Sequence, residues 1–344
     1  MRKVLSILLI AILLFSVTAC GGSKEKAATT TDDQKFVLKW AHSSPAEGDR
    51  LGDASKVIID QIAEESGGRL TFEYYPASQL GAERDTLEGV SLGTVDLAII
   101  STGPIEGFFP EISATAIPYL LTDRATAWAV YDGPFGDKLS AMMEEETGMK
   151  VLGWAENGFR TFSNNVREVK TPADMKGLKI RTMENETHMA IVNSMGASAI
   201  PVSFAELYTA LAQGTVDGQE NGVALTYNQK LYEHLKYVTL DYHIYDPYVI
   251  VMSGKAWDSL PADLQKILQK GIDDYVDLER EYNIRDDEKC LQLMKDAGLQ
   301  VYEPTEADFL EFKKATSGIE TMIRKNVGDE IVDEFINAVE EAKK

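Results

Sequence analysis

Cysteine, basic residues and long apolar runs are all scarce in this chain. Its 344 residues contain two cysteines, Cys20 and Cys290, which excludes a disulfide framework. After the N-terminal segment, no hydrophobic run reaches the roughly 18 residues of a spanning helix. Lys and Arg total 34 against 55 Asp and Glu, a net charge of −21. Nucleic-acid binding is therefore disfavoured, and any site for an anion must be built from locally placed cations.

The motifs of common enzymes are also missing. The four histidines, His42, His188, His234 and His243, show no metal-ligand spacing, and there is no phosphate loop or dinucleotide turn. Residues 89–93 match the G-x-S-x-G pattern, but a helix is predicted before them and a strand after them, the reverse of what that motif needs. The sequence therefore predicts no catalytic residue, no metal and no cofactor.

The N-terminus carries the features of an exported protein. Arg2 and Lys3 precede an apolar run over residues 4–17, which is typical of a secretory signal. The run ends at Val-Thr-Ala-Cys20, which resembles a bacterial lipobox with an acylated cysteine. We therefore expect a signal peptide over 1–19 and a lipidated, flexible tether over 20–33. An uncleaved membrane anchor is the alternative.

Helix and strand periodicities alternate along the first third of the chain. They predict strands and helices in the order β-α-β-α-β, which gives a right-handed crossover sheet with helices on both faces. The expected elements are a strand at 36–41, a helix at 54–65, a strand at 70–74, a helix at 82–92 and a strand at 95–100.

The same alternation begins again further on. Strands are expected at 151–154, 159–163 and 178–181, helices at 186–195 and 203–213, and a strand from Thr215. The segment 203–206 has the pattern of a capping box. Helical spacing over 261–295 predicts a helix about 45 Å long, which is enough to cross two lobes.

A short internal repeat links the two parts. Gly-Thr-Val-Asp occurs at 93–96 and again at 214–217, each time after a predicted helix and before a predicted strand. Four residues can match by chance, so the repeat only supports an arrangement of two equivalent halves. Because ligands of open α/β sheets lie at the carboxyl ends of strands, Ser101 and Thr102 would then face Gln219 and Asn221 across one cleft.

Two arginines at strand ends are the strongest candidates for chemistry. Arg160 lies near the start of the strand predicted at 159–163, and Arg181 ends an apolar one. The planar guanidinium suits a carboxylate, because it offers two parallel, charge-assisted hydrogen bonds. Taken alone, each arginine is more typical of an ordinary surface ion pair than of a binding site.

Several segments together resemble the solute-binding proteins of tripartite ATP-independent periplasmic (TRAP) transporters, of the C4-dicarboxylate-binding type. These segments are residues 75–84, the strand of Arg160, and 176–181, 201–211 and 213–221, within a resemblance that covers about 39–248. The resemblance implies two α/β lobes that close on a carboxylate, with a long helix spanning both. The ligand-binding residues that it implies, or that lie on the matching segments, are Arg181, Arg160, Asn221, Phe204, Glu83, Arg84, His42, Ser101, Thr102 and Gln219.

The predicted protein is a monomeric binding protein outside the cytoplasm that serves a TRAP-type permease. Lobe I is expected over 34–156 and 246–285, and lobe II over 157–245 and 286–344. Arg84 is the only candidate cation for a second carboxylate, whereas Glu83 and its neighbours suit hydroxyl groups. The prediction therefore favours a sugar acid such as a hexuronate over a C4-dicarboxylate. An enzyme acting on an organic acid, or a structural surface lipoprotein, remains as an alternative.

Overall fold

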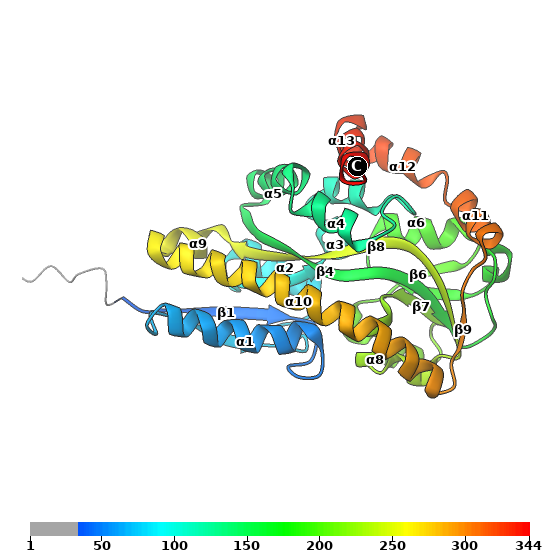
Figure 1. Cartoon of the computed structure of the whole chain (residues 1–344), viewed down its shortest axis with the longest axis horizontal. Coiled ribbons are helices and arrows are strands. Elements are labelled where there is room, and N and C mark those ends of the chain that lie inside the picture. Colours follow the sequence, from blue (N-terminus) through cyan, green and yellow to red (C-terminus); the bar gives the residue numbers. More distant parts are fainter. Residues whose placement is uncertain (1–33) are drawn as a thin grey trace, which may run out of the picture. The chain divides into compact units, whose positions relative to one another are not determined.

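Two long antiparallel strands, β4 and β8, run through the middle of a nine-stranded mixed sheet in the computed structural model (Figure 1). The structure describes residues 34–344, so the predicted signal peptide, Cys20 and the tether lie outside the described residues. The sheet order is β2-β1-β3-β8-β4-β7-β5-β6, and β9 pairs with β8. The strands are β1 (Phe36–His42), β2 (Leu70–Tyr75), β3 (Leu97–Ser101), β4 (Met149–Asn164), β5 (Lys179–Thr182), β6 (Ser198–Pro201), β7 (Gly218–Asn221), β8 (Tyr237–Ser253) and β9 (Gln300–Tyr302).

Helices cover both faces of this sheet. They are α1 (Arg50–Glu65), α2 (Glu83–Leu92), α3 (Thr102–Ile105), α4 (Arg124–Tyr131), α5 (Pro134–Thr147), α6 (Glu186–Ser194), α7 (Phe204–Ala212), α8 (Val223–Asn228), α9 (Gly254–Ser259), α10 (Ala262–Asp296), α11 (Glu306–Ala315), α12 (Ile319–Val327) and α13 (Asp329–Ala342). Three 3-10 turns complete the set: η2 (Pro110–Ala116), η3 (Pro172–Met175) and η4 (Leu231–His234). None of the helices described is long and apolar enough to cross a membrane.

The sheet is built from two similar groups of strands on either side of the long pair. Strands β1, β2 and β3 are parallel, and β3 pairs antiparallel with β8. Strands β5, β6 and β7 are likewise parallel, and β7 pairs antiparallel with β4. Each group therefore has the order β-α-β-α-β, which the sequence predicts for the first group, and the carboxyl ends of the two groups point toward each other across β4 and β8.

The long helix α10 occupies the position expected of a helix shared by both groups. It spans Ala262–Asp296, one residue off the predicted range at each end, and its 35 residues extend roughly 52 Å at about 1.5 Å per residue. It packs against α1 of the first group, against the central strand β4, and against α8, which follows β7 of the second group, as Figure 1 shows. Gly271 permits the contact with α1, since a Cβ there would lie 2.4 Å from Ile62 Cγ1.

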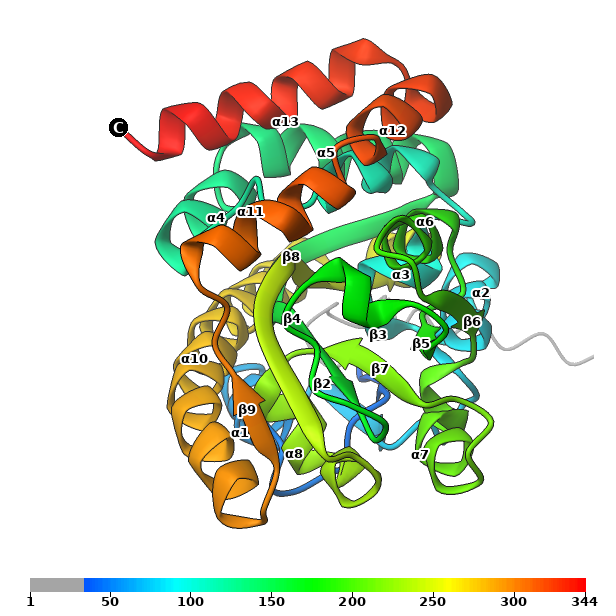
Figure 2. The same ribbon diagram turned by 90° about the vertical axis from the view of Figure 1, so that its right-hand side faces the viewer.

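Two of the C-terminal helices, α12 and α13, pack mainly on the segment between β3 and β4, although α12 also contacts α6 of the second group. Helix α12 packs on η2 and α6, and α13 packs on α4, α5 and η2, an arrangement visible in Figure 2. The core of this layer includes the rings of Phe335 and Phe135, which are tilted against each other with centroids 5.2 Å apart. The expectation that all of 286–344 belongs with 157–245 therefore does not describe these two helices.

Two local predictions differ from the structure. The strands expected at 151–154 and 159–163 form one strand, because the chain passes through a bulge at Gly158, whose φ is 98°. That bulge interrupts the alternation of apolar residues without ending the strand. The capping box expected at Ser203 does not form either, because the Ser203 hydroxyl donates to the Glu206 carboxylate at 2.9 Å rather than capping the helix.

Candidate functional site: a buried cavity beside Arg181

A small buried cavity lies where the carboxyl ends of the two strand groups meet. Its volume is about 10 Å³, which is room for about one water molecule. Its walls come from β1, α2 and β3 on one side and from β4, β5, α7 and β7 on the other, closed by β8. The lining residues are Ser43, Glu83, Ser101, Asn157, Arg160, Arg181, Met183, Phe204, Asn221, Leu225 and Tyr248.

Arg181 is the most unusual residue of this cavity. It is the penultimate residue of β5 and is 1% exposed. Its Nε donates to the Val202 carbonyl at 2.8 Å, and its guanidinium lies 5.9 Å from the centroid of the Phe204 ring. Its Nη1 has no hydrogen-bond partner among residues 34–344. Burial lowers the pKa of Arg181 to about 10, although the charge of Glu220 opposes this, so the side chain is still a cation at neutral pH.

Arg160 also reaches the cavity, but its guanidinium is largely occupied by protein carboxylates. Its Nη1 donates to Asp246 Oδ2 at 2.8 Å, and its Nη2 donates to the carbonyl and to Oε1 of Glu220 at 2.6 and 2.9 Å. Its Nε donates to the same carboxylate. All three side chains are 0% exposed. Arg160 is therefore a buried, neutralised cation that has little hydrogen-bonding capacity left for a ligand.

Behind Arg160, two histidines extend the buried network. His243 Nε2 lies 3.4 Å from Glu220 Oε2, and its Nδ1 lies 2.9 Å from Asp241 Oδ2. Burial opposes protonation, but these two carboxylates raise the pKa of His243 to about 9. His188 Nδ1 lies 3.5 Å from Glu220 Oε1. Burial would raise the pKa of Glu220, yet Arg160 and the two histidines hold it well below its usual value.

The opposite wall is formed by hydroxyl groups and one carboxyl group. The Ser101 hydroxyl donates to Glu83 Oε2 at 2.5 Å, and the Ser43 hydroxyl lies 3.3 Å from Oε1. The Ser101 amide also donates to Oε1, at 3.3 Å. Glu83 is 9% exposed and has no ion pair among the described residues. Burial raises its pKa, against the opposing hydrogen bonds from Ser101.

The predicted polar residues of β7 are divided between the cavity and the layer behind it. Asn221 lines the cavity, and its Nδ2 donates to Gln219 Oε1 at 2.5 Å. Gln219 does not line the cavity, because its amide donates to Ser163 Oγ at 2.7 Å and to Thr226 Oγ1 at 3.2 Å. Residues two apart on a strand face the same side, which brings the Gln219 and Asn221 side chains into contact. Gln219 thus positions Asn221.

Three further predicted residues lie outside the cavity lining. Arg84 lines a separate cavity of about 580 Å³ with Glu106 and Lys325, because adjacent residues of a helix point in different directions and Glu83 takes the inward position. His42 contacts the Tyr74 hydroxyl at 2.7 Å, and burial lowers its pKa to about 3, so it is neutral.

The third residue, Thr102, does not line the cavity, and its hydroxyl donates to Asp246 Oδ1 at 2.6 Å. Because Arg84 lines a different cavity, the cation expected from the first group is absent from the small one.

The structure adds lining residues that had no signal in the sequence. Asn157 donates from Nδ2 to Asp246 Oδ2 at 2.9 Å, and Arg50 Nη2 lies 3.3 Å from Asn157 Oδ1. Tyr248 of β8 lies under the Arg50 guanidinium, 5.6 Å from it. Arg50 is itself buried and paired with Glu279 at 2.7 Å. These residues meet only because β4, β8 and α10 cross.

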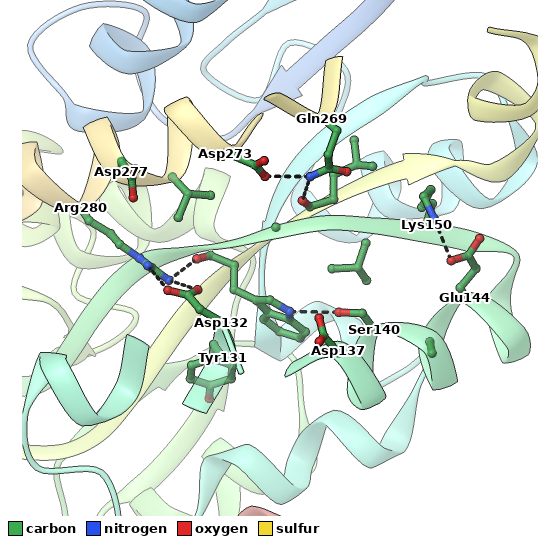
Figure 3. Close-up of a pocket in the computed structure, with 16 residues that line it drawn as sticks. Tyr131, Asp132, Asp137, Ser140, Glu144, Lys150, Gln269, Asp273, Asp277 and Arg280 are labelled. Atoms are coloured by element: carbon green, nitrogen blue, oxygen red, sulfur yellow. Dashed lines mark hydrogen bonds and ion pairs between the residues drawn. The ribbon is translucent and has the colours of Figure 1, made fainter. Parts of the chain in front are cut away.

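A much larger cavity lies on the outside of the sheet, and its cations are already paired with protein carboxylates. It has a volume of about 560 Å³ and lies between α5, β4 and α10 (Figure 3). Its arginine, Arg280, is held by Asp132 at 2.6 and 2.8 Å and by the Trp154 carbonyl at 2.7 Å. Its lysine, Lys150, pairs with Glu144 at 3.2 Å. Because both cations are neutralised, this cavity is a poorer site for an acid than the small one.

Comparisons with known proteins agree on one family. The model of the bacterial extracellular solute-binding proteins, family 7, matches residues 41–324. A solute-binding protein of Verminephrobacter eiseniae is 36% identical over 295 residues, which are 86% of this chain and 87% of that protein. The 2,3-diketo-L-gulonate-binding periplasmic protein of Escherichia coli is 33% identical over 286 residues, 83% of each chain. The C4-dicarboxylate-binding periplasmic protein of Rhodobacter capsulatus is 30% identical over 313 residues, 90% of this chain and 91% of that protein.

Solved structures show the same similarity. The sugar acid binding protein of Advenella mimigardefordensis, in complex with galactonate, superposes with a TM-score of 0.87 at 28% identity and covers 90% of this chain and 99% of that one. A TRAP periplasmic solute-binding protein of Polaromonas sp. JS666, bound to D-erythronate, superposes with a TM-score of 0.83 at 33% identity and covers 88% and 98%.

Proposed function

The chain belongs to the bacterial extracellular solute-binding proteins of family 7, and we propose that within this family it binds a sugar acid with one carboxylate. The resemblance to TRAP solute-binding proteins is confirmed, as is the α/β fold of a two-lobed binding protein. The family serves transport and not catalysis, which removes the enzyme alternative.

The observation that supports the proposal is that one nitrogen of the Arg181 guanidinium, Nη1, has no hydrogen-bond partner among residues 34–344. A buried polar group without a partner is rare and needs a reason, and a buried charge without one is costly. Arg181 is 1% exposed, with Nη1 unpaired among residues 34–344, and it faces a cavity lined by Asn221 and Phe204. A ligand carboxylate placed there would satisfy Nη1 and remove the cost of the unpaired cation.

The opposite wall favours hydroxyl groups over a second carboxylate. Within the described part of the chain, the cations that line the cavity are Arg160 and Arg181, and Arg160 is already bound by Glu220 and Asp246. Glu83, Ser43 and Ser101 supply hydrogen-bond acceptors and hydroxyls. A hydroxylated acid can bond to all three, whereas a second carboxylate would face Glu83 without a cation. The sugar acids galactonate and D-erythronate, bound by structural relatives, have this chemistry.

Ligand entry requires the two walls to separate. A cavity of about 10 Å³ admits roughly one water molecule, far less than a sugar acid needs. We propose that lobe I (34–156 and 246–285) and lobe II (157–245 and most of 286–344) hinge about β4, β8 and α10, with α12 and α13 moving with lobe I, on which they pack. Closure then removes water from the charged hydrogen bonds and strengthens them.

The remaining parts of the proposal concern place and partner. An extracytoplasmic location follows from the family. We propose in addition that residues 1–19 are removed, that Cys20 is acylated, and that residues 20–33 tether a monomer to the membrane beside a TRAP-type permease. Cys20→Ala should release the protein from membranes without changing its thermal stability, and a variant that stays membrane-bound would count against the anchor.

The ligand class is tested by isothermal titration calorimetry with a panel of galactonate, galacturonate, glucuronate, gluconate, succinate and malate. The sugar acids should bind more tightly than the two dicarboxylates. Arg84→Ala tests whether the small cavity is the site. It removes a nearby cation that lines a different cavity, so the affinity for the sugar acids should not change. Tight binding of succinate or malate with no response to sugar acids would replace the proposed ligand with a C4-dicarboxylate.

A further inference from the structure

The charges around the cavity do not balance. Two guanidinium groups, those of Arg160 and Arg181, stand among three carboxyl groups, those of Glu83, Glu220 and Asp246, and none of the five is more than 9% exposed. The protonated His243 behind them does not change this balance, because it is paired with a further carboxylate, Asp241, at 2.9 Å. Glu220 and Asp246 both hold Arg160. Arg181 is therefore the one cation lining the cavity that no carboxylate within 4 Å neutralises, and Glu83 and a ligand carboxylate would have to share it.

A ligand carboxylate would bring a fourth anionic group into this enclosed space. Like charges interact strongly where water is excluded, and two carboxylates that share one buried site do not both remain ionised. One of the four must therefore bind a proton when the ligand carboxylate docks on Arg181.

We infer that ligand binding takes up one proton and that Glu83 holds it. In the complex, Glu83 is then a neutral carboxyl group that donates a hydrogen bond to a ligand oxygen while still accepting from Ser101. This inference rests on the proposed function, because it requires an acid at Arg181. Glu83 would therefore favour a ligand whose oxygen can accept a hydrogen bond from the protonated carboxyl group.

The surroundings of each carboxyl group single out Glu83. Glu220 is contacted by Arg160, His188 and His243. Asp246 accepts hydrogen bonds from Arg160, Asn157 and Thr102. Both therefore have strong donors that favour the ionised form.

Glu83 has only the Ser43 and Ser101 hydroxyls and the Ser101 amide. Burial already raises its pKa, and the charge of Asp246 on β8 adds to this, opposed by Arg181 on β5.

The other titratable groups near Glu83 do not replace it as the proton acceptor. Burial raises the pKa of Tyr248 on β8 well above its usual value, so this hydroxyl keeps its proton throughout. His42 on β1 is engaged by the Tyr74 hydroxyl at 2.7 Å, and its pKa is lowered to about 3. Arg160 on β4 stays charged between its two carboxylates.

The sign of the pH dependence follows. A carboxylate bound at Arg181 raises the pKa of Glu83 further, so the complex binds more protons than the free protein between the two pKa values. Affinity must then rise as pH falls through this window, by up to about tenfold per pH unit for one proton. Below the pKa of free Glu83 the dependence vanishes, because the proton is already present before binding.

The test is calorimetry of galactonate and galacturonate binding at a series of pH values that spans the window, each in buffers with different ionisation enthalpies. The dependence of the observed heat on buffer counts the protons taken up, and we expect about one for the unaltered protein. Glu83→Gln should abolish both the buffer dependence and the rise of affinity at lower pH. Glu106→Gln is the matched control: burial also raises the pKa of Glu106, but this residue lies outside the cavity, so proton uptake should persist.

Three results would overturn the inference. Binding heats that do not depend on buffer would exclude proton uptake, and uptake that persists in Glu83→Gln would assign the proton elsewhere. Absence of binding by both sugar acids would overturn the proposed function and this inference with it. If Glu83→Gln does not fold or bind, infrared difference spectra of the unaltered protein decide: a protonated carboxyl band must appear on ligand addition, and no new band would refute the assignment to Glu83.

Discussion

The two strand groups share one local structure but differ in the chemistry they bring to the cavity. The Gly-Thr-Val-Asp segments at 93–96 and 214–217 have the same conformation, with left-handed glycines at φ of 80° and 68°. Asp96 accepts from the Lys39 amide at 2.8 Å, and Asp217 accepts from the Lys179 amide at 2.8 Å. The weak internal repeat therefore marks equivalent junctions, each of which fixes two neighbouring parallel strands.

Corresponding positions then carry different side chains. In the first group Ala41 pairs with Ala98, and at the same register in the second group Arg181 pairs with Gln219. The position of Asn221 corresponds to Ile100, counted from the two aspartates. The helices before the two repeats begin at Glu83 and Phe204, so these positions also correspond.

This difference indicates which positions of the fold determine ligand specificity. The equivalent aspartates and glycines place the backbone in the same way on both sides, whereas the strand ends and helix starts are free to vary. The second group uses them for a cation, an amide and an aromatic ring, and the first group for a carboxyl group and hydroxyls. The cleft therefore has one wall suited to an acid group and one suited to hydroxyl groups.

The largest effect should come from breaking the neutralised network of the second group. Arg160→Ala leaves Glu220 and Asp246 buried without their cation, and such a loss costs about 3–5 kcal/mol in the free energy of unfolding. Chemical denaturation measures it. The control is Arg324→Ala, which removes exposed ion pairs to Glu320 and Asp333 and should cost about 1 kcal/mol or less. Equal losses would mean that the buried network has no special structural role.

Arg181 should behave in the opposite way, which sharpens the distinction between the two arginines. Arg181→Met should weaken binding of the best sugar acid by about 3 kcal/mol or more, because it removes the cation of the cavity that has no carboxylate partner among residues 34–344. The free energy of unfolding should not decrease, because a buried, incompletely satisfied charge is removed. Arg181→Lys should restore part of the affinity, since lysine lacks the planar fork.

Calorimetry and denaturation of the same variants separate the two effects. If Arg181→Met binds as tightly as the unaltered protein, Arg181 is not part of the site.

The sequence predicts the first group of elements well and the crossing strands poorly. Strands β1 and β2 and helices α1 and α2 each bury one face, so apolar periodicity finds them within a few residues. Strand β8 is buried almost throughout and carries Asp241, His243 and Asp246 in its interior. Continuous burial removes the alternation, and the polar residues interrupt the apolar run, so no pattern indicates a strand of 17 residues.

The residues of the candidate site also differ in how well the sequence predicts them. Arg181, Asn221, Phe204 and Glu83 lie on short motifs of the family, and the structure brings all four to one cavity. The links from Glu220 to His188 and His243 depend instead on the register of β4, β7 and β8. Contacts between residues so far apart in the chain have no signal in a single sequence, and four scattered histidines gave no reason to select two of them.

A smaller effect tests whether the two junctions are energetically equivalent. Asp96→Ala and Asp217→Ala each remove a carboxylate that accepts a backbone amide at 2.8 Å. Hydrogen bonds to charged groups contribute about 1.5–3 kcal/mol, so we expect losses in this range that are similar for the two variants. The double variant should lose the sum, because distant sites add. Chemical denaturation would contradict the equivalence if one variant were neutral and the other strongly destabilised.

The smallest expected effect concerns the glycines of the same junctions. Gly93 and Gly214 have left-handed φ angles, which cost other residues about 1–2 kcal/mol. An added Cβ meets nothing within 4 Å at Gly214, and its nearest neighbour at Gly93 is Ser253 Oγ at 3.4 Å. Steric contact is therefore minor at both sites, and Gly93→Ala and Gly214→Ala should lose about the same free energy of unfolding, through backbone strain alone.

Gly318 is the matched control, since its φ is −83° and a Cβ there meets nothing within 4 Å. Gly318→Ala should be neutral or stabilise by up to about 1 kcal/mol, because it restricts the unfolded chain without straining the folded one. A loss at Gly318 as large as at the two junctions would mean that the left-handed conformation is not what these glycines provide. A loss at only one junction would show that the repeat is equivalent in geometry but not in the free energy that it contributes to each group.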